Sequence, residues 1–280
     1  IYAKRRFLMS IVSTGWLSKN HSKVKIIDSS WHMPGTNRDA YEEYKKEHIK
    51  NTIFFDIDKS SNKKTELPHM LPNEKDWEKV VSNLGITNQD RIVVYDNSDV
   101  ISSCRCWYTF IFFGHKPNLI SVLDGGLLKW KKEKKETSNS ASKLEKKIYK
   151  AKKISNLVKT QNEINKNILE KKFKVVDARS KQRFLGLEKE PRPGLKSGSI
   201  ENSYCLPFGE LINLENKTFL EKNLIKEKFA GIGVNNENNV VFSCGSGITA
   251  AVLGLAYSMI NDKYLPIVYD GSWAEYGRIK

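Results

Sequence analysis

Acidic residues, cysteine and long apolar runs are all scarce in this 280-residue chain. Lysine and arginine together number 47 against 32 aspartates and glutamates, so the formal net charge is +15. Four cysteines are too few for a disulfide scaffold and favour a reducing compartment. The apolar stretch from Gly247 to Ile260 falls short of the roughly eighteen residues that a membrane-spanning helix needs, and no other run reaches that length. We therefore expect a cytoplasmic protein with no membrane partner.

The N-terminal residues lack the features of a targeting signal. Residues 1–8 are basic, but they have neither an adequate apolar stretch nor a cleavage site. Met9 is therefore the expected start of the native chain, and residues 1–8 are expected to be an upstream extension.

The excess of positive charge raises the question of nucleic-acid binding. The lysines are dispersed, however, and where they are densest, from Lys129 to Lys153, glutamates interrupt them. The chain also has no basic motif interleaved with aromatic residues of the kind that RNA-binding proteins carry. A solvated, lysine-rich surface is the preferred interpretation, so we expect no nucleic-acid partner. A basic nucleic-acid-binding protein is kept as a non-enzyme alternative.

The sequence indicates neither a metal nor an organic cofactor. Cys104 and Cys106 have the spacing of half a zinc site, but no further ligands follow at zinc-like spacing. Two packed thiols are the simpler interpretation. We therefore expect no metal site and no cofactor.

The chain repeats itself at a spacing of about 150 residues, which indicates a duplicated domain. The matching segments are 25–29 with 174–178, 48–51 with 199–202, 92–96 with 240–244, and 123–126 with 269–272. Within each half, short β-branched runs alternate with amphipathic segments such as 76–84 and 220–229, a pattern typical of α/β domains. The predicted fold class is therefore α/β, with two tandem domains, each a parallel sheet flanked by helices. We expect these domains at 10–130 and 154–280, joined by a charged linker at 131–153.

Cys244 has the most informative position of the four cysteines. Residues 239–243 form a short apolar run that predicts a buried strand, and residues 248–260 predict a helix. A cysteine at the start of a helix faces backbone N–H groups and the positive end of the helix dipole, which favour a thiolate. Gly245 and Gly247 should let the backbone curl around that sulfur. Asp96 stands at the equivalent position of the first half, so the chemistry is predicted for the second half only.

The motifs together resemble those of the two-domain rhodaneses and, among these, the 3-mercaptopyruvate sulfurtransferases. In the second half they are Cys-Gly-Ser-Gly-Ile-Thr-Ala at 244–250, Tyr-Asp-Gly-Ser-Trp at 269–273, and the arginine-rich motif at 177–194. In the first half they are Phe-Phe-Asp-Ile-Asp at 54–58 and Leu-Pro-His-Met-Leu-Pro at 67–72. The resemblance implies tandem rhodanese-like domains, of which the first is non-catalytic.

Two features favour the mercaptopyruvate branch of that family. Gly-Ser-Gly follows the cysteine, where thiosulfate-preferring rhodaneses typically carry Arg-Lys-Gly. Arg183 and Arg192 match the arginines that bind the substrate carboxylate in the family, and guanidinium groups suit that task because they engage both oxygens. The departures from the family pattern, at 103–104 and 198–202, touch none of the residues expected to carry the chemistry.

The resemblance implies a two-step transfer in which Cys244 takes sulfur from 3-mercaptopyruvate, releases pyruvate and holds the sulfur as a persulfide. Ser246, His69 and Asp58 are the implied proton relay, with His69 and Asp58 contributed by the first domain. The backbone around Gly245, Gly247, Ile248 and Thr249 would bind the sulfur or substrate. The acceptor would be a thiol, such as thioredoxin or a small thiol, or cyanide.

Several alternatives stay open. The nearest is a thiosulfate:cyanide sulfurtransferase, a rhodanese, with the same nucleophile. A rhodanese-like scaffold is the non-enzyme alternative within the fold. A cysteine phosphatase is disfavoured, because Ala250 stands where that class needs an arginine.

Overall fold

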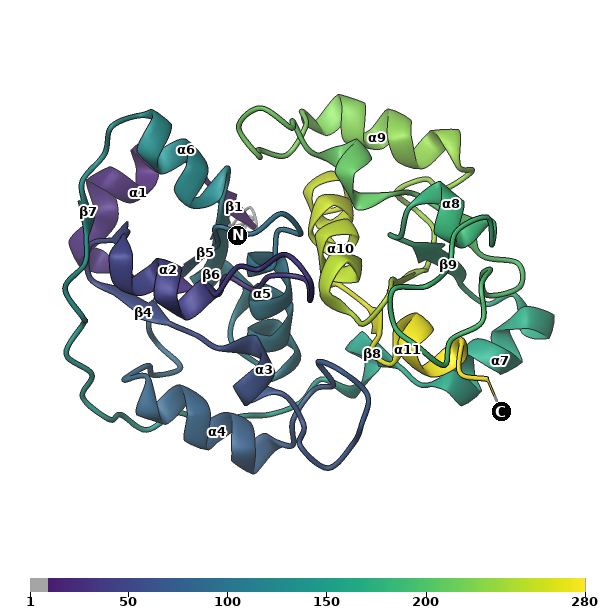
Figure 1. Cartoon of the computed structure of the whole chain (residues 1–280), viewed down its shortest axis with the longest axis horizontal. Coiled ribbons are helices and arrows are strands. Elements are labelled where there is room, and N and C mark those ends of the chain that lie inside the picture. Colours follow the sequence, from purple (N-terminus) through teal and green to yellow (C-terminus); the bar gives the residue numbers. More distant parts are fainter. Residues whose placement is uncertain (1–9, 280) are drawn as a thin grey trace, which may run out of the picture.

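Helices and strands alternate along both halves of the chain, as the sequence pattern predicts (Figure 1). A computed structural model of the chain describes residues 10–279, so the expected start at Met9 lies outside the described residues. The elements of the first half are β1 Ile11–Val12, α1 Thr14–Asn20, β2 Lys25–Asp28, α2 Ala40–Lys46, β3 His48–Ile49, β4 Thr52–Phe54, α3 Ile57–Ser60, α4 Glu74–Asn83, β5 Ile92–Tyr95, α5 Ser103–Phe112, β6 Ile120–Leu123 and α6 Gly126–Lys132. Those that follow are β7 Thr137–Ser138, β8 Val158–Lys159, α7 Gln161–Glu170, β9 Lys174–Asp177, α8 Lys181–Phe184, β10 Tyr204–Cys205, α9 Lys222–Gly231, β11 Val240–Ser243, α10 Ile248–Ile260, β12 Val268–Tyr269 and α11 Ser272–Tyr276.

Each half contains one five-stranded parallel sheet, and the two sheets have the same order. The first sheet is β1-β6-β5-β2-β4, and the second, taken from the matching edge, is β8-β12-β11-β9-β10. The repeat extends to single residues, since Asn51 and Asn202 both have left-handed backbones, with φ of 59° and 60°. The predicted fold class, two tandem α/β domains of parallel sheets flanked by helices, is confirmed.

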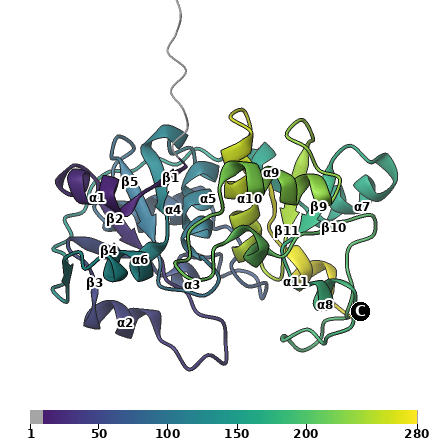
Figure 2. The ribbon, with the colours of Figure 1, turned by 90° about the horizontal axis from the view of Figure 1, so that it is seen from above.

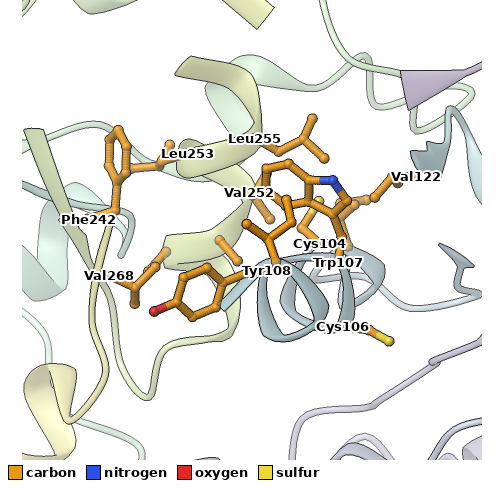
Figure 3. Packing of buried hydrophobic residues seen from close by; sticks show 14 of the residues in the cluster. Cys104, Cys106, Trp107, Tyr108, Val122, Phe242, Val252, Leu253, Leu255 and Val268 are labelled. Carbon is orange, nitrogen blue, oxygen red and sulfur yellow. The ribbon is translucent and has the colours of Figure 1, made fainter. Parts of the chain in front are cut away.

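The long helices α5 and α10 lie side by side between the two sheets (Figures 1 and 2). Every residue of α5 is buried, and so is α10 from Ile248 to Met259 except Thr249. Trp107 of α5 meets Val252 of α10 in this interface (Figure 3), within a hydrophobic cluster that both domains share. Each helix follows the central strand of its own sheet, so this packing also brings the loops before the two helices together.

The segment between the domains lies along the first domain rather than hanging free (Figure 1). Strand β7 pairs antiparallel with β3, and the amides of Lys147 and Lys152 donate to the carbonyls of Ser82 and Phe113. Tyr149 anchors the segment, because its side chain is buried in the shared core. The charged residues of this stretch therefore cover the surface of the first domain.

None of the helices within residues 10–279 combines the length and the hydropathy that crossing a membrane requires.

Candidate active site

Cys244 lies in a tight loop between β11 and α10, as the sequence predicts. Its Sγ accepts a hydrogen bond of 3.1 Å from the amide of Gly247, which immediately precedes the helix. The side chain is only 2% exposed, and the Cys244 amide donates to Ser272 Oγ at 3.2 Å. The sulfur therefore lies at the N-terminal end of a thirteen-residue helix, where the helix dipole is positive.

The two glycines of this loop have different functions, which differs from the sequence prediction. Gly247 has a φ of 81° and is the residue that turns the chain into the helix. Gly245 does not have a positive φ, and its missing side chain leaves space for neighbouring groups instead. A Cβ on Gly245 would lie 3.3 Å from Arg183 Nη2 and 3.6 Å from Arg192 Nη1. The predicted curl therefore depends on Gly247, whereas Gly245 lets two guanidinium groups approach the loop.

Gly247→Ala is expected to destabilise the fold by about 2 kcal/mol or more. The left-handed backbone costs alanine about 1–2 kcal/mol, and the new Cβ would lie 2.8 Å from buried Arg105 Nη1. Gly209→Ala is the matched control, because its Cβ would meet nothing within 4 Å. Urea denaturation of the two variants measures the difference, and equal midpoints would contradict the strain at Gly247.

Ser246, His69 and Asp58 form a continuous chain of polar contacts across the domain interface. Ser246 Oγ lies 3.0 Å from His69 Nδ1, and His69 Nε2 lies 3.2 Å from Asp58 Oδ1. His69 is 5% exposed, and its backbone has a φ of 60°. The structure therefore brings the three predicted relay residues together, next to the loop that holds Cys244. Such a chain of polar contacts can transfer a proton to a group bound beside Ser246.

Trp31 supports this chain and was missed in the sequence. Its Nε1 donates to Asp58 Oδ2 at 2.9 Å, and its ring meets the ring of His69 edge-on at 4.8 Å. The hydrogen bond from His69 comes first among the causes that hold the pKa of Asp58 below its usual value. Asp56, rather than Asp58, caps α3 by accepting from the amide of Lys59. Trp31 follows the carboxyl end of β2, where side chains of parallel sheets gather around sites, and that position was the available signal.

Arg183 and Arg192, which the sequence treats as a pair, have different partners. Arg183 donates to both oxygens of Glu190, through Nε at 3.2 Å and Nη2 at 2.5 Å. Arg192 donates through Nη2 to Ser246 Oγ at 3.3 Å, and no carboxylate of residues 10–279 forms an ion pair with it. Burial is the main reason why the pKa of Arg192 is lowered. Arg192 is therefore the guanidinium best placed to take an incoming carboxylate.

Glu190 and Arg179 hold this side of the site in place. Glu190 also accepts from Arg179 Nη1 at 2.7 Å, and the Arg179 guanidinium pairs with Asp177 at 2.8 Å. The Arg179 guanidinium lies 4.3 Å from the centre of the Trp273 ring, and the amide of Trp273 donates to the carbonyl of Cys244 at 2.9 Å. Asp177 thus accepts hydrogen bonds at a strand end, and the tryptophan lies directly behind the cysteine loop.

A cleft of about 480 Å³ opens over the relay. Residues 31–38 form one wall, and Asp58, Pro68, His69 and Arg192 line the rest. Glu43 fixes that wall at both ends, since it pairs with His32 at 3.1 Å and with Arg38 at 2.7 Å. The lining reaches Arg192 and His69 but does not include Cys244. A small anion entering here therefore meets Arg192 before it meets the sulfur.

The other three cysteines are free thiols, and two of them lie in α5. Cys104 and Cys106 are buried on different sides of α5 (Figure 3), and burial raises the pKa of both thiols. Within residues 10–279, no group of three His, Cys, Asp or Glu side chains is arranged to hold a metal ion. In the first domain, Asp96 accepts from the amides of Ser98 and Ser103 at 2.9 and 3.0 Å. A carboxylate thus takes the place of the nucleophile there.

Comparison with known proteins matches the chain along nearly its whole length. The rhodanese-like domain profile matches residues 13–133 and 160–278. The chain is 36% identical to thiosulfate/3-mercaptopyruvate sulfurtransferase 1, mitochondrial, of Arabidopsis thaliana, covering 95% of this chain and 75% of that protein. It is 34% identical to the 3-mercaptopyruvate sulfurtransferase of Mus musculus, covering 98% and 94%. The crystal structure of SseA from Escherichia coli, described as a 3-mercaptopyruvate sulfotransferase with the rhodanese fold, superposes with a TM-score of 0.84 at 28% identity over 95% of this chain and 100% of that one.

Proposed function

This chain belongs to the rhodanese family and is a sulfurtransferase of the group that uses 3-mercaptopyruvate or thiosulfate, and from that premise we propose that 3-mercaptopyruvate is its sulfur donor. In the first step the Cys244 thiolate attacks the sulfur of 3-mercaptopyruvate. The carbon–sulfur bond breaks, and its electron pair leaves with the carbon as the enolate of pyruvate. A proton delivered at Ser246 converts this enolate into pyruvate, and Cys244 keeps the sulfur as a persulfide.

In the second step an acceptor thiol, or cyanide, attacks the outer sulfur of the persulfide. The sulfur–sulfur bond breaks, the acceptor carries the sulfur away, and Cys244 returns to the thiolate. The amide of Gly247, 3.1 Å from Sγ, stabilises the negative charge in the thiolate. The neighbouring loop of Gly245, Ile248 and Thr249 surrounds the outer sulfur, whose charge lies farther from the helix.

The chain from Ser246 through His69 to Asp58 is the observation that carries this proposal. An enolate leaving group needs a proton, whereas the sulfite that leaves thiosulfate does not. A proton relay beside the nucleophile is therefore useful to a mercaptopyruvate enzyme and is not needed for thiosulfate cleavage. Thiosulfate stays the second candidate donor, because the Arabidopsis relative carries both donors in its name.

Steady-state turnover with the two donors, measured in parallel with cyanide as the acceptor, tests the proposal. We expect kcat/KM to be higher for 3-mercaptopyruvate. A preference for thiosulfate would make the chain a thiosulfate:cyanide sulfurtransferase with the same nucleophile. Absence of turnover with either donor would favour the scaffold alternative.

Arg192→Met is expected to lower kcat/KM for 3-mercaptopyruvate by about 10-fold to 100-fold, the range for losing a hydrogen-bonded charge partner. The guanidinium lies at the cleft and forms no ion pair with a carboxylate of residues 10–279, so the substrate carboxylate is its expected partner. Arg192→Lys keeps the charge without the fork and should recover part of the loss. Initial rates across donor concentrations measure the effect, and an unchanged kcat/KM in Arg192→Met would exclude the assignment.

We further propose that the protein works in the cytoplasm with a soluble thiol, such as thioredoxin or a small thiol, as acceptor. Cell fractionation tests the compartment, since the Arabidopsis relative is named as mitochondrial.

The nucleic-acid alternative predicts binding that persists at physiological ionic strength. We expect none, because many of the surface lysines are paired with glutamates, as Lys50 is with Glu136 and Lys147 with Glu145.

A further inference from the structure

A buried ion pair joins the two domains directly beneath the relay. Arg105, the only charged residue of α5, is 2% exposed, and its Nη2 lies 2.7 Å from Asp270 Oδ1. Asp270 follows β12 in the second domain and is 4% exposed. A buried pair of this kind is a poor source of stability, because desolvation offsets most of the attraction between its charges. Both side chains of the pair also form hydrogen bonds with the backbone near the relay.

Those hydrogen bonds hold the backbone on both sides of Met70. Arg105 Nη2 also donates to the carbonyl of His69 at 2.6 Å, and Asp270 Oδ2 accepts from the amide of Leu71 at 2.8 Å. His69 has a φ of 60°, a conformation that costs free energy and persists only where the surroundings impose it. The ion pair contributes to that constraint, since it binds the carbonyl of His69 itself and the amide of Leu71 just after this turn.

The same arginine reaches the cysteine loop. Arg105 Nη1 donates to the carbonyl of Gly247 at 3.3 Å. One guanidinium thus binds the backbone of His69 in the first domain and the backbone of Gly247 in the second. The distance between those two backbones decides whether His69 Nδ1 lies within hydrogen-bond reach of Ser246 Oγ, which it does at 3.0 Å.

We infer that Arg105 and Asp270 are positioning residues that hold His69 against Ser246 and so determine the rate of protonation of the leaving group. The inference rests on the proposed function, because only a donor whose leaving group needs a proton depends on this contact. Neither residue touches the substrate in this scheme. Misplacement of a catalytic group by about 1 Å can lower the rate on the order of 100-fold. Loss of the ion pair should therefore lower the rate of pyruvate release measurably.

Single-turnover release of pyruvate from 3-mercaptopyruvate tests the inference in Arg105→Lys and in the isosteric Asp270→Asn. We expect a fall of about 10-fold to 100-fold in each. In a His69→Ala background the same substitutions should add less than about 2-fold, because residues that act through one group are not additive. The rate at which iodoacetamide alkylates Cys244 should stay within about 2-fold, since the relay is not needed for that reaction. Lys217→Met is the matched control, because it removes another ion pair between the domains, with Asp99 at 2.6 Å, away from the relay.

An additive loss in the His69→Ala background would overturn the inference, and so would a parallel loss of Cys244 alkylation or an unchanged release of pyruvate. If Arg105→Lys does not fold, Asp270→Asn decides the question, because it keeps the shape of the side chain. Failure of the proposed function is recognised separately, since the wild-type protein would then release no pyruvate at all.

Discussion

Replacing Cys244 with serine is expected to lower the rate of sulfur transfer by about 10⁴-fold to 10⁶-fold, the loss found when the nucleophile of a covalent mechanism is removed. The substitution keeps the size of the side chain and the place of the hydrogen bond from Gly247, so the loop should stay folded. A hydroxyl at this position is not ionised near neutral pH and cannot form a persulfide. Initial rates of pyruvate release from 3-mercaptopyruvate and of sulfite release from thiosulfate measure the loss.

Cys205→Ser is the matched control for that experiment. Cys205 is half-buried in β10, and burial raises the pKa of its thiol to about 11. It is therefore a poor nucleophile at neutral pH, and its loss should leave the rate unchanged within about 2-fold. Mass spectrometry after incubation with the donor should find one added sulfur, located on the peptide that contains Cys244. Added sulfur on Cys205, or turnover by Cys244→Ser above about 1% of wild type, would contradict the assigned nucleophile.

Local sequence patterns predicted the fold well because the duplication supplied each pattern twice. The helix expected at 248–260 begins and ends where predicted, since Gly247 provides the left-handed turn before it. The matching segments 25–29 and 174–178 contain β2 and β9, and the structure pairs these strands with β5 and β11 in equivalent registers. In these cases neighbouring residues in the chain determine the conformation.

Contacts between distant residues could not be predicted from the patterns. His69 and Ser246 are 177 positions apart, and only the packing of α5 against α10 brings them together. The sequence also treated Arg183 and Arg192 alike, because nothing in their spacing shows that Glu190 neutralises one and not the other. Arg105 did give a signal, as a lone cation in an otherwise uncharged helix, but its partners lie in other segments.

His69→Ala is expected to slow single-turnover release of pyruvate from 3-mercaptopyruvate by about 10²-fold to 10³-fold, within the range of general acid–base catalysis. The imidazole is the link between Ser246 Oγ, at 3.0 Å, and the Asp58 carboxylate, at 3.2 Å. Without it, the proton for the enolate must come from water or from Ser246 alone. Cys244 itself is untouched, because its amide contacts come from its own loop and from Ser272.

The comparison with thiosulfate distinguishes a proton relay from a structural contact. Sulfite leaves thiosulfate without needing a proton, so loading of Cys244 from thiosulfate should change by less than about 3-fold in His69→Ala. Asp58→Asn should lower the rate of pyruvate release from 3-mercaptopyruvate by an intermediate factor. Lowering the pH should have the same effect on the wild-type protein. The pKa of Asp58 is depressed in the folded protein, so the carboxylate and its contact with His69 persist above that pKa and are lost as the pH falls through it. If His69→Ala lowers the rates with both donors equally, His69 has a structural role in the loop. The relay then no longer favours 3-mercaptopyruvate over thiosulfate as the donor.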